Sequence, residues 1–121
     1  MANEISISAS LSSSKTGLTV AGSGSINVTQ TAAAMLAAIQ SIGTSSEAVD
    51  IGDIADLAYL FVKNESLVNF VYLSLVSPPT VSNSFAKLLP GEFALVPCKQ
   101  ELVYGLADTT ACDCQVVAVS T

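Results

Sequence analysis

The sequence predicts an all-β protein, an antiparallel β-sandwich or a jelly-roll-like barrel, on three observations. Residues 5–12 alternate strictly between apolar side chains and serine, runs of β-branched and aromatic residues recur towards the C-terminus, and Gly, Pro, Ser, Thr and Asn cluster between these runs. Strict alternation is typical of half-buried antiparallel strands, and short strands at close spacing are typical of sandwiches and barrels. We therefore expect roughly eight to ten strands in a single all-β domain over residues 1–121.

The first 30 residues predict three of these strands. In the first strand, one face carries Ile5, Ile7, Ala9 and Leu11. Residues 13–17 have turn composition and residues 18–20 alternate again, so the two segments predict a hairpin. Gly22-Ser23-Gly24 interrupts the pattern, and a third strand is expected over residues 25–30.

The alanine-rich segment that follows is open to two interpretations. The residues from Ala32 to Ala38 have high helix propensity, and Thr31 could cap a helix at its start. The neighbouring segments all have strand periodicity, and tertiary context overrides propensity over so short a stretch. The sequence therefore predicts either one short Ala-rich helix or an extended strand here.

The central segment predicts a β-hairpin. Residues 58–62 and 68–75 are rich in β-branched and aromatic residues, and the polar residues 63–66 separate them. If the rings of Phe61 and Phe70 are buried there, replacing either with alanine should cost about 3–5 kcal/mol.

Turn residues divide the rest of the chain into short strands. Residues 44–47 indicate a turn and residues 49–51 a strand, and Pro78 and Pro79 indicate an exposed loop over residues 77–80. Pro90 and Gly91 fit the central positions of a type II turn. The remaining strands are expected over residues 85–89, 92–96, 102–106 and 114–119, with a turn over residues 108–110.

The composition argues against catalysis, because His, Arg and Trp are all absent. Imidazole is the usual base and metal ligand near neutral pH, and guanidinium is the usual ligand for phosphates and oxyanions. We therefore expect no enzymatic activity, no catalytic or metal-binding residues and no cofactor.

Charge and hydropathy restrict the partners. A net charge of −6 disfavours direct binding of nucleic acid. Although the mean hydropathy is +0.59, no apolar run approaches the roughly 20 residues of a spanning helix, and the N-terminus lacks the pattern of a secretory signal, so we expect no membrane partner and folding in the cytoplasm. Charged residues make up only 12% of the chain, and such a surface suits contact with other protein, including further copies of the chain.

The three cysteines predict buried thiols. Cys112 and Cys114 are two residues apart in a strand-like segment, so their side chains should share one face. With Cys98 they form an odd-numbered set without histidine, which fits neither a zinc site nor a disulfide framework. Buried cysteines commonly behave as small apolar residues.

The sequence also suggests three specific functional sites, and for each of them a structural role is favoured. Asp50, Asp53 and Asp56, close to Glu47, could gather around calcium, but their spacing is not that of an EF-hand and an acid-rich solvated turn is favoured. Glu92 after Pro90-Gly91 suggests a cupin-like enzyme, whose metal site needs imidazoles, and a turn carboxylate is favoured. The tyrosines could form a receptor- or glycan-binding surface, although each lies in a β-former run where core or cross-strand packing is more common; they are Tyr59, Tyr72 and Tyr104.

Several blocks of the chain resemble a family of small all-β virion proteins of tailed bacteriophages. The blocks are Gln40-Ser41-Ile42-Gly43-Thr44-Ser45-Ser46-Glu47-Ala48-Val49-Asp50-Ile51-Gly52-Asp53-Ile54, then Tyr59-Leu60-Phe61-Val62-Lys63-Asn64 with Asn69-Phe70-Val71, and then Lys87-Leu88-Leu89-Pro90-Gly91-Glu92-Phe93-Ala94-Leu95. The resemblance covers the chain and is strongest over residues 40–96. The alanine-rich stretch and the pair Cys112 and Cys114 depart from the family pattern.

The resemblance implies a jelly-roll-like unit in the virion, assembled in the bacterial host cytoplasm. The expected role is a capsid decoration or cement protein that contacts the major capsid protein and its own copies as a dimer or trimer, with docking contacts from edge strands or from residues 77–84. A tail or head-fibre component, or a host receptor- or glycan-binding module, is the alternative.

Overall fold

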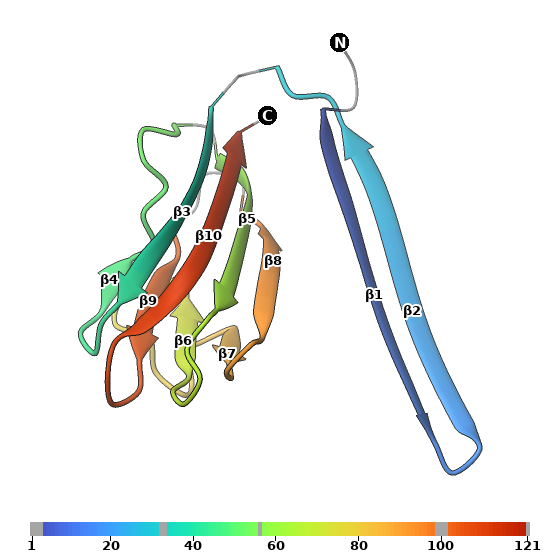
Figure 1. The fold of residues 1–121 in the computed structure, drawn as a ribbon. Coiled ribbons are helices and arrows are strands. Elements are labelled where there is room, and N and C mark those ends of the chain that lie inside the picture. Colours follow the sequence, from blue (N-terminus) through green and yellow to red (C-terminus); the bar gives the residue numbers. More distant parts are fainter. Residues whose placement is uncertain (1–3, 32–33, 56, 99–101, 121) are drawn as a thin grey trace. The chain divides into compact units, whose positions relative to one another are not determined.

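The computed structural model describes residues 4–31, 34–55, 57–98 and 102–120. The internal contacts divide the chain into two units, one made of the described residues up to 31 and the other of those from 34 to 120. The first unit is a two-stranded ribbon, and the second holds eight strands in two sheets (Figure 1). A single domain over residues 1–121 stays a prediction.

The ribbon consists of β1 (Ile5–Lys15) and β2 (Leu18–Val28), which pair antiparallel along their full length. Thr16 and Gly17 form the two-residue connection, with φ of 51° and 80°. Two consecutive positive φ values are those of a type I′ turn, whose twist matches that of the flanking strands. Glycine adopts this conformation without steric cost at the second position.

The prediction of three strands in this region was wrong, because β2 runs uninterrupted through Gly22-Ser23-Gly24. Gly22 pairs with Leu11 and Gly24 with Ala9, in the same register as the rest of the ribbon. A Cβ built on either glycine meets no atom within 4 Å. Because a side chain at either position would contact nothing, glycine costs the ribbon no packing there and the strand continues.

The second unit is a sandwich of eight strands. They are β3 (Met35–Ile42), β4 (Glu47–Ala48), β5 (Leu57–Asn64), β6 (Val71–Ser74), β7 (Ala86–Leu88), β8 (Phe93–Pro97), β9 (Tyr104–Ala107) and β10 (Cys112–Ser120). One sheet has the strand order β3-β10-β5-β8 and the other β4-β9-β6-β7, with every pair antiparallel. The all-β sandwich that the sequence predicted is confirmed.

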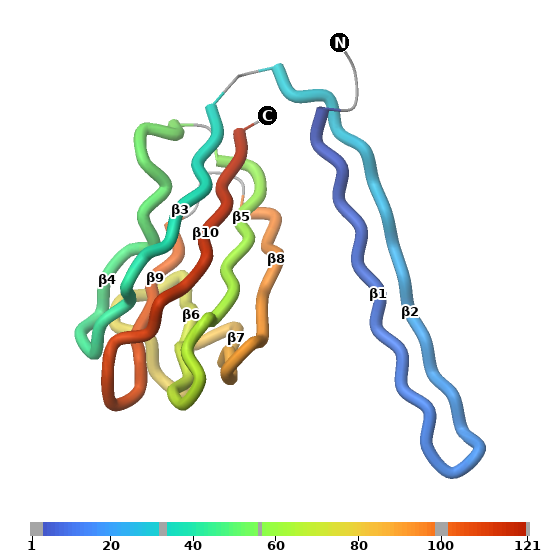
Figure 2. Tube along the Cα trace, in the orientation of Figure 1, coloured from blue at the N-terminus to red at the C-terminus, as the bar shows by residue number. Residues whose placement is uncertain are grey.

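The pairing of the strands is that of a jelly roll. β3 pairs with β10, β4 with β9, β5 with β8 and β6 with β7, so the second unit is one long hairpin wound into two sheets. Figure 2 follows the chain as it crosses from one sheet to the other at almost every connection. The sheets stay separate, as in double-sheet jelly rolls, and do not close into a barrel.

The core of the sandwich lies between the two sheets. Its fully buried large side chains include Ile42, Leu60, Val62, Val71, Leu73 and Val116. The layers meet closely where β9 passes under β3, because a Cβ on Gly105 would lie 2.9 Å from Ile42 Cδ1. Glycine at this position allows the close approach.

The alanine-rich segment forms a strand from Met35 onward, so the helical alternative was wrong for the residues that the structure describes; Ala32 and Ala33 lie outside them. β3 pairs with β10 from Met35↔Val119 to Ile42↔Cys112. These sheet contacts outweigh the helix propensity of a few alanines. The described part of the chain also contains no helix long and apolar enough to cross a membrane.

The predicted hairpin of residues 58–62 and 68–75 was wrong in its pairing. The two segments are strands, but β5 pairs with β10 and β8, whereas β6 pairs with β7 and β9 in the other sheet. The connection between them crosses the sandwich. Adjacent strands in sequence can therefore belong to opposite layers even when a polar turn separates them.

Most of the remaining predictions agree with the structure. Pro90 and Gly91 occupy a turn closed by the Glu92 N–H donating to the Leu89 carbonyl at 2.9 Å, and Gly91 has a φ of 83°, as a type II turn requires. The strand predicted over residues 49–51 was wrong, because β4 is Glu47–Ala48 and a loop follows. Residues 77–80 form the predicted loop, although Pro79 within it is buried.

Candidate assembly surfaces

The sheet β3-β10-β5-β8 has an outer face built from three rows of side chains, each row crossing all four strands. The register gives the rows as Met35, Val119, Tyr59 and Pro97; Ala37, Val117, Phe61 and Leu95; and Ile39, Gln115, Lys63 and Phe93. These twelve residues are called the outer face. Because successive residues of a strand point to opposite sides, their neighbours in sequence form the inner face that packs into the core.

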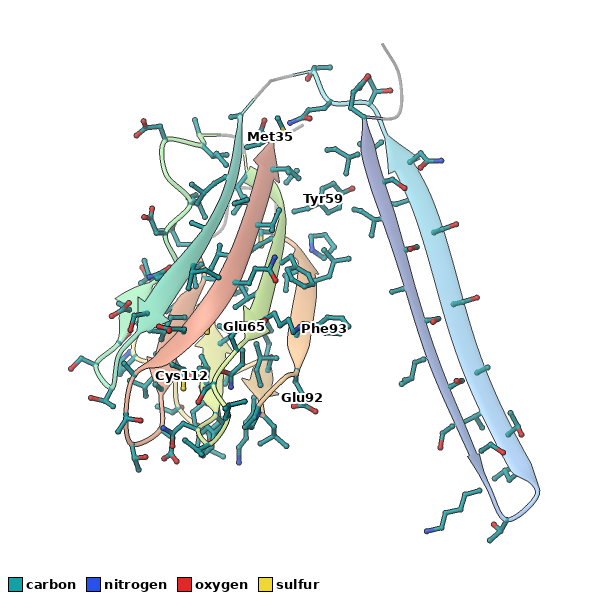
Figure 3. All side chains as sticks on the ribbon, viewed as in Figure 1. Met35, Tyr59, Glu65, Glu92, Phe93 and Cys112 are labelled. Carbon is teal, nitrogen blue, oxygen red and sulfur yellow. The ribbon has the colours of Figure 1, made fainter. Side chains whose placement is uncertain are left out.

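Ten of the twelve side chains of the outer face are apolar, and the most prominent are well exposed. Met35 is 67% exposed, Ile39 63% and Phe93 62%. The rings of Phe61 and Phe93 stack, with centroids 5.6 Å apart, and Figure 3 shows Tyr59 and Phe93 projecting from the strands of this sheet. An antiparallel sheet with one face in water normally alternates apolar and polar residues, and this sheet does not.

Charged groups gather at one end of the outer face. Lys63 lies in the third row, and its Nζ is 3.4 Å from Glu65 Oε1. Asp113 lies two residues before Gln115 on β10, on the same side of the sheet, and pairs with Ser41. The first two rows contain no charged side chain, so polarity increases along the strands towards this end.

The ribbon also has one apolar and one polar face. Its register places Leu11, Leu18, Val20 and Ile26 on the same side, with exposed fractions between 50% and 79%. The opposite side carries Ser6, Ser8, Ser10, Ser12, Ser14, Thr19, Ala21, Ser23, Ser25 and Asn27. A two-stranded ribbon with an uncovered apolar face is at best marginally stable in water, so this unit requires contacts to stay folded.

The outer side of the second sheet is smaller and more polar. Tyr72 lies between Leu106 and Lys87 in one cross-strand row, and the Lys87 ammonium sits 4.2 Å from the centroid of the Phe70 ring. Phe70 and Tyr72 meet edge to face at 5.1 Å. This arrangement is a local cation–π cluster and covers a smaller area than the outer face.

The three tyrosines do not form one surface. Tyr59 belongs to the outer face, whereas Tyr72 and Tyr104 lie on strands of the other sheet. The receptor-type surface suggested by the sequence would need all three together, and the sandwich separates them. Tyr72 lines a hollow of about 310 Å³, with Val81, Ser84, Phe85, Ala86 and Lys87.

Asp50 and Glu47 use their carboxylates in hydrogen bonds within the chain, one to a backbone N–H and one to a side-chain amide. Asp50 Oδ1 accepts a hydrogen bond from the Gly52 N–H at 2.8 Å, which closes an Asx-type turn, and Glu47 Oε1 accepts from Gln40 Nε2 at 3.1 Å. Asp56 lies outside the described residues. Within those residues, no group of three His, Cys, Asp or Glu side chains is placed to hold a metal ion.

Glu92 is a turn carboxylate. Its Oε1 accepts a hydrogen bond from the Leu89 N–H at 2.8 Å, across the turn that Gly91 completes. Its own N–H returns a bond to the Leu89 carbonyl. The cupin-like alternative rested on the position of Glu92 after Pro90-Gly91, and here the carboxylate of Glu92 closes the turn between β7 and β8.

The cysteines lie in the interior of the sandwich. Cys112 and Cys114 are fully buried on the inner face of β10, as their spacing predicted, and Cys98 is 5% exposed. Burial, followed by the charges of Cys112, Asp113 and Glu65, raises the pKa of the Cys114 thiol from 9.0 to about 12. Cys114 therefore stays protonated and unreactive in the folded protein at neutral pH.

Residues 77–84, predicted as docking contacts, form a loop organised by Asn83. Its Oδ1 accepts from the Thr80 N–H at 2.7 Å, and its Nδ2 donates to the Pro78 carbonyl at 3.0 Å. Val81, within this loop, is 80% exposed. The loop is thus held in shape by its own side chains and presents one aliphatic residue.

Sequence reasoning missed the structural role of Asn64, which it placed in a polar turn. Asn64 is fully buried at the end of β5, and its Nδ2 donates to the carbonyls of Asn69 at 2.8 Å and Leu88 at 2.9 Å. Its Oδ1 accepts from the Ser66 N–H at 2.9 Å. One amide thereby connects β5 to segments of the opposite sheet, a role that a polar residue following an apolar run can signal.

Comparison with known proteins gives no relative: no family model, no curated protein and no solved structure matches this chain.

Proposed function

We propose that this chain is a structural protein of a tailed bacteriophage particle, a capsid decoration or cement protein that binds the major capsid protein and its own copies. The observation that carries the proposal is the composition of the outer face. Ten of its twelve side chains, from four strands, are apolar, and the most prominent of them are exposed. A surface of this kind marks a site of contact with other protein.

Two further observations support a structural role. The jelly-roll pairing is one that viral capsid proteins use, although lectins and cupins share it, so it supports the proposal only by association. The ribbon has an apolar strip of its own, which is a second surface available for binding to a repeating shell. The sequence blocks that resemble small phage virion proteins supply the link to a phage particle.

The copy number of the protein in purified particles tests the proposal. A cement protein should be present in hundreds of copies, in fixed ratio to the major capsid protein, and particles lacking it should lose their heat stability. A few copies to a few tens per particle would indicate a tail or head-fibre component instead. Complete absence from particles would end the proposal.

A host-directed binding module is the second candidate, and one observation favours it. The hollow beside Tyr72 and Lys87 contains Phe85, which is 45% exposed, together with the Ser84 hydroxyl, which is buried without a hydrogen-bond partner. Aromatic rings beside polar groups can stack on a sugar ring. This function predicts that particles lacking the protein stay intact and heat-stable but fail to adsorb to cells.

A further inference from the structure

We infer that the outer face is the contact surface between two copies of this chain. The inference deepens the proposed function, which requires contacts between copies. Its test uses the purified protein without any particle, so that self-association and virion binding can fail separately.

The composition of the outer face is that of an interface core. Its centre holds Tyr59 and Phe61, flanked by Met35, Phe93 and Leu95, and no charged side chain occurs in the first two rows. Interface cores are enriched in aromatic residues and methionine and depleted in charge. A solvated sheet face of a monomer has the opposite composition.

The size of the face is sufficient for a specific dimer. The four strands have eight, nine, eight and five residues, so at ~3.4 Å per residue and ~4.8 Å between strands the sheet measures roughly 20 by 25 Å. Two copies that pack over this whole sheet bury about 1,000 Å², the least that a specific interface needs. Sheets pack face to face ~10 Å apart with their strands within about 30° of each other, so two such faces can interdigitate.

The charges at the end of the outer face favour a second copy of this chain over a partner whose surface carries only positive or only negative charge. Lys63 supplies a positive group, and Glu65 and Asp113 supply negative ones, all near the third row. A contact between identical copies is isologous, so each copy offers both signs to the other. These groups then form a polar rim around the apolar rows, as interfaces commonly have.

Sedimentation of the full-length protein from nanomolar to submillimolar concentration tests this inference. The wild-type protein should self-associate, and Phe93→Lys and Ile39→Lys should each weaken the association at least ~100-fold, because both bury an ammonium group in an apolar contact. Both side chains are more than 60% exposed in the single chain, so the thermal midpoint of the monomer should change little in either variant. Phe93→Lys gives up only the stacking of its ring on Phe61. Leu67→Lys, at a residue that is 90% exposed outside the outer face, is the matched control and should associate like wild type.

Three results would overturn the inference. The first is a wild-type protein that is monomeric at every concentration. The second is unchanged association of both lysine variants. The third is a monomer whose thermal midpoint falls in Ile39→Lys but not in Leu67→Lys, because that would show that the face is covered from within the chain. Phe93→Leu keeps an apolar residue and should restore association, which separates loss of the contact from misfolding.

Discussion

The two faces of the sheet β3-β10-β5-β8 are both apolar, yet only one of them has a covering layer. The inner face carries Leu60, Val62 and Val116, which are at most 1% exposed against the second sheet. The outer face carries Met35, Ile39 and Phe93, all more than 60% exposed. A sheet that is apolar on both faces is the type found buried on both sides, and this difference is the basis for our proposal that a second copy covers the outer face.

The largest difference between the faces should appear in neighbouring residues of β5. Leu60→Ala should lower the free energy of unfolding by about 2–5 kcal/mol, because it leaves a cavity between the sheets. Phe61→Ala, one residue later on the half-buried outer face, should cost only about 1 kcal/mol in the monomer, below the range expected from sequence. Urea unfolding at low protein concentration measures both, and equal losses would contradict the assignment of the faces.

The next largest loss of stability is expected at Asn64, the polar side chain buried at the end of β5. Asn64→Ala removes three hydrogen bonds and leaves two carbonyls and one N–H unsatisfied, so we expect a loss of about 2–4 kcal/mol. Asn27→Ala on the exposed polar side of the ribbon is the control and should change stability by less than about 0.5 kcal/mol. A loss at Asn64 no larger than at Asn27 would show that its amide does not connect the sheets.

Gly105→Ala tests how closely the inner face packs. The new methyl group would lie 2.9 Å from Ile42 Cδ1 and 3.1 Å from its Cγ2, so overpacking should cost about 1–3 kcal/mol. Ile42→Val removes the nearer of these atoms and should recover part of the loss in a double-mutant cycle. If the changes in stability caused by the two substitutions were additive in that cycle, the two residues would not be in contact.

The thiols of the inner face predict a pH dependence. The folded-state pKa of Cys114, about 12, lies above that of an unfolded thiol, so the stabilisation is complete below about pH 9 and is lost as pH rises towards 12. In this range the unfolded chain releases a proton that the folded chain retains, and stability should fall by about 1.4 kcal/mol per pH unit. Thermal unfolding between pH 8 and 10 should show a smaller decrease in Cys114→Ala, and identical curves would contradict the burial of this thiol.

Local patterns in the sequence were enough to find most strands but not their partners. Alternation identified β1, and the β-former runs identified β5 and β10, because side-chain direction along a strand depends only on neighbouring residues. The partner of β5 was misassigned to β6, since pairing depends on contacts between segments far apart in the chain, here β10 and β8. The strand at Met35 was left open for the same reason.

The outer face could not be assembled from the sequence, because its rows combine residues such as Ala37, Phe61, Leu95 and Val117 from four separated strands. One signal was present: residues 57–62 are almost continuously apolar, as in strands covered on both sides. Such a run is typical of a strand that has a covering layer on each side, and this applies to β5. Only the register of the sheet shows which other residues share it.

The accessibility of a thiol placed on the outer face tests the central claim most directly. Ala37 is exposed in the second row of the face, and Ser82 is exposed in the 77–84 loop, while the native cysteines are buried. The account predicts that a maleimide labels Ala37→Cys at least ~10-fold more slowly than Ser82→Cys at high protein concentration, and that the two rates converge on dilution as the copies separate. Equal rates at every concentration, or protection of Ala37→Cys that persists on dilution, would contradict it.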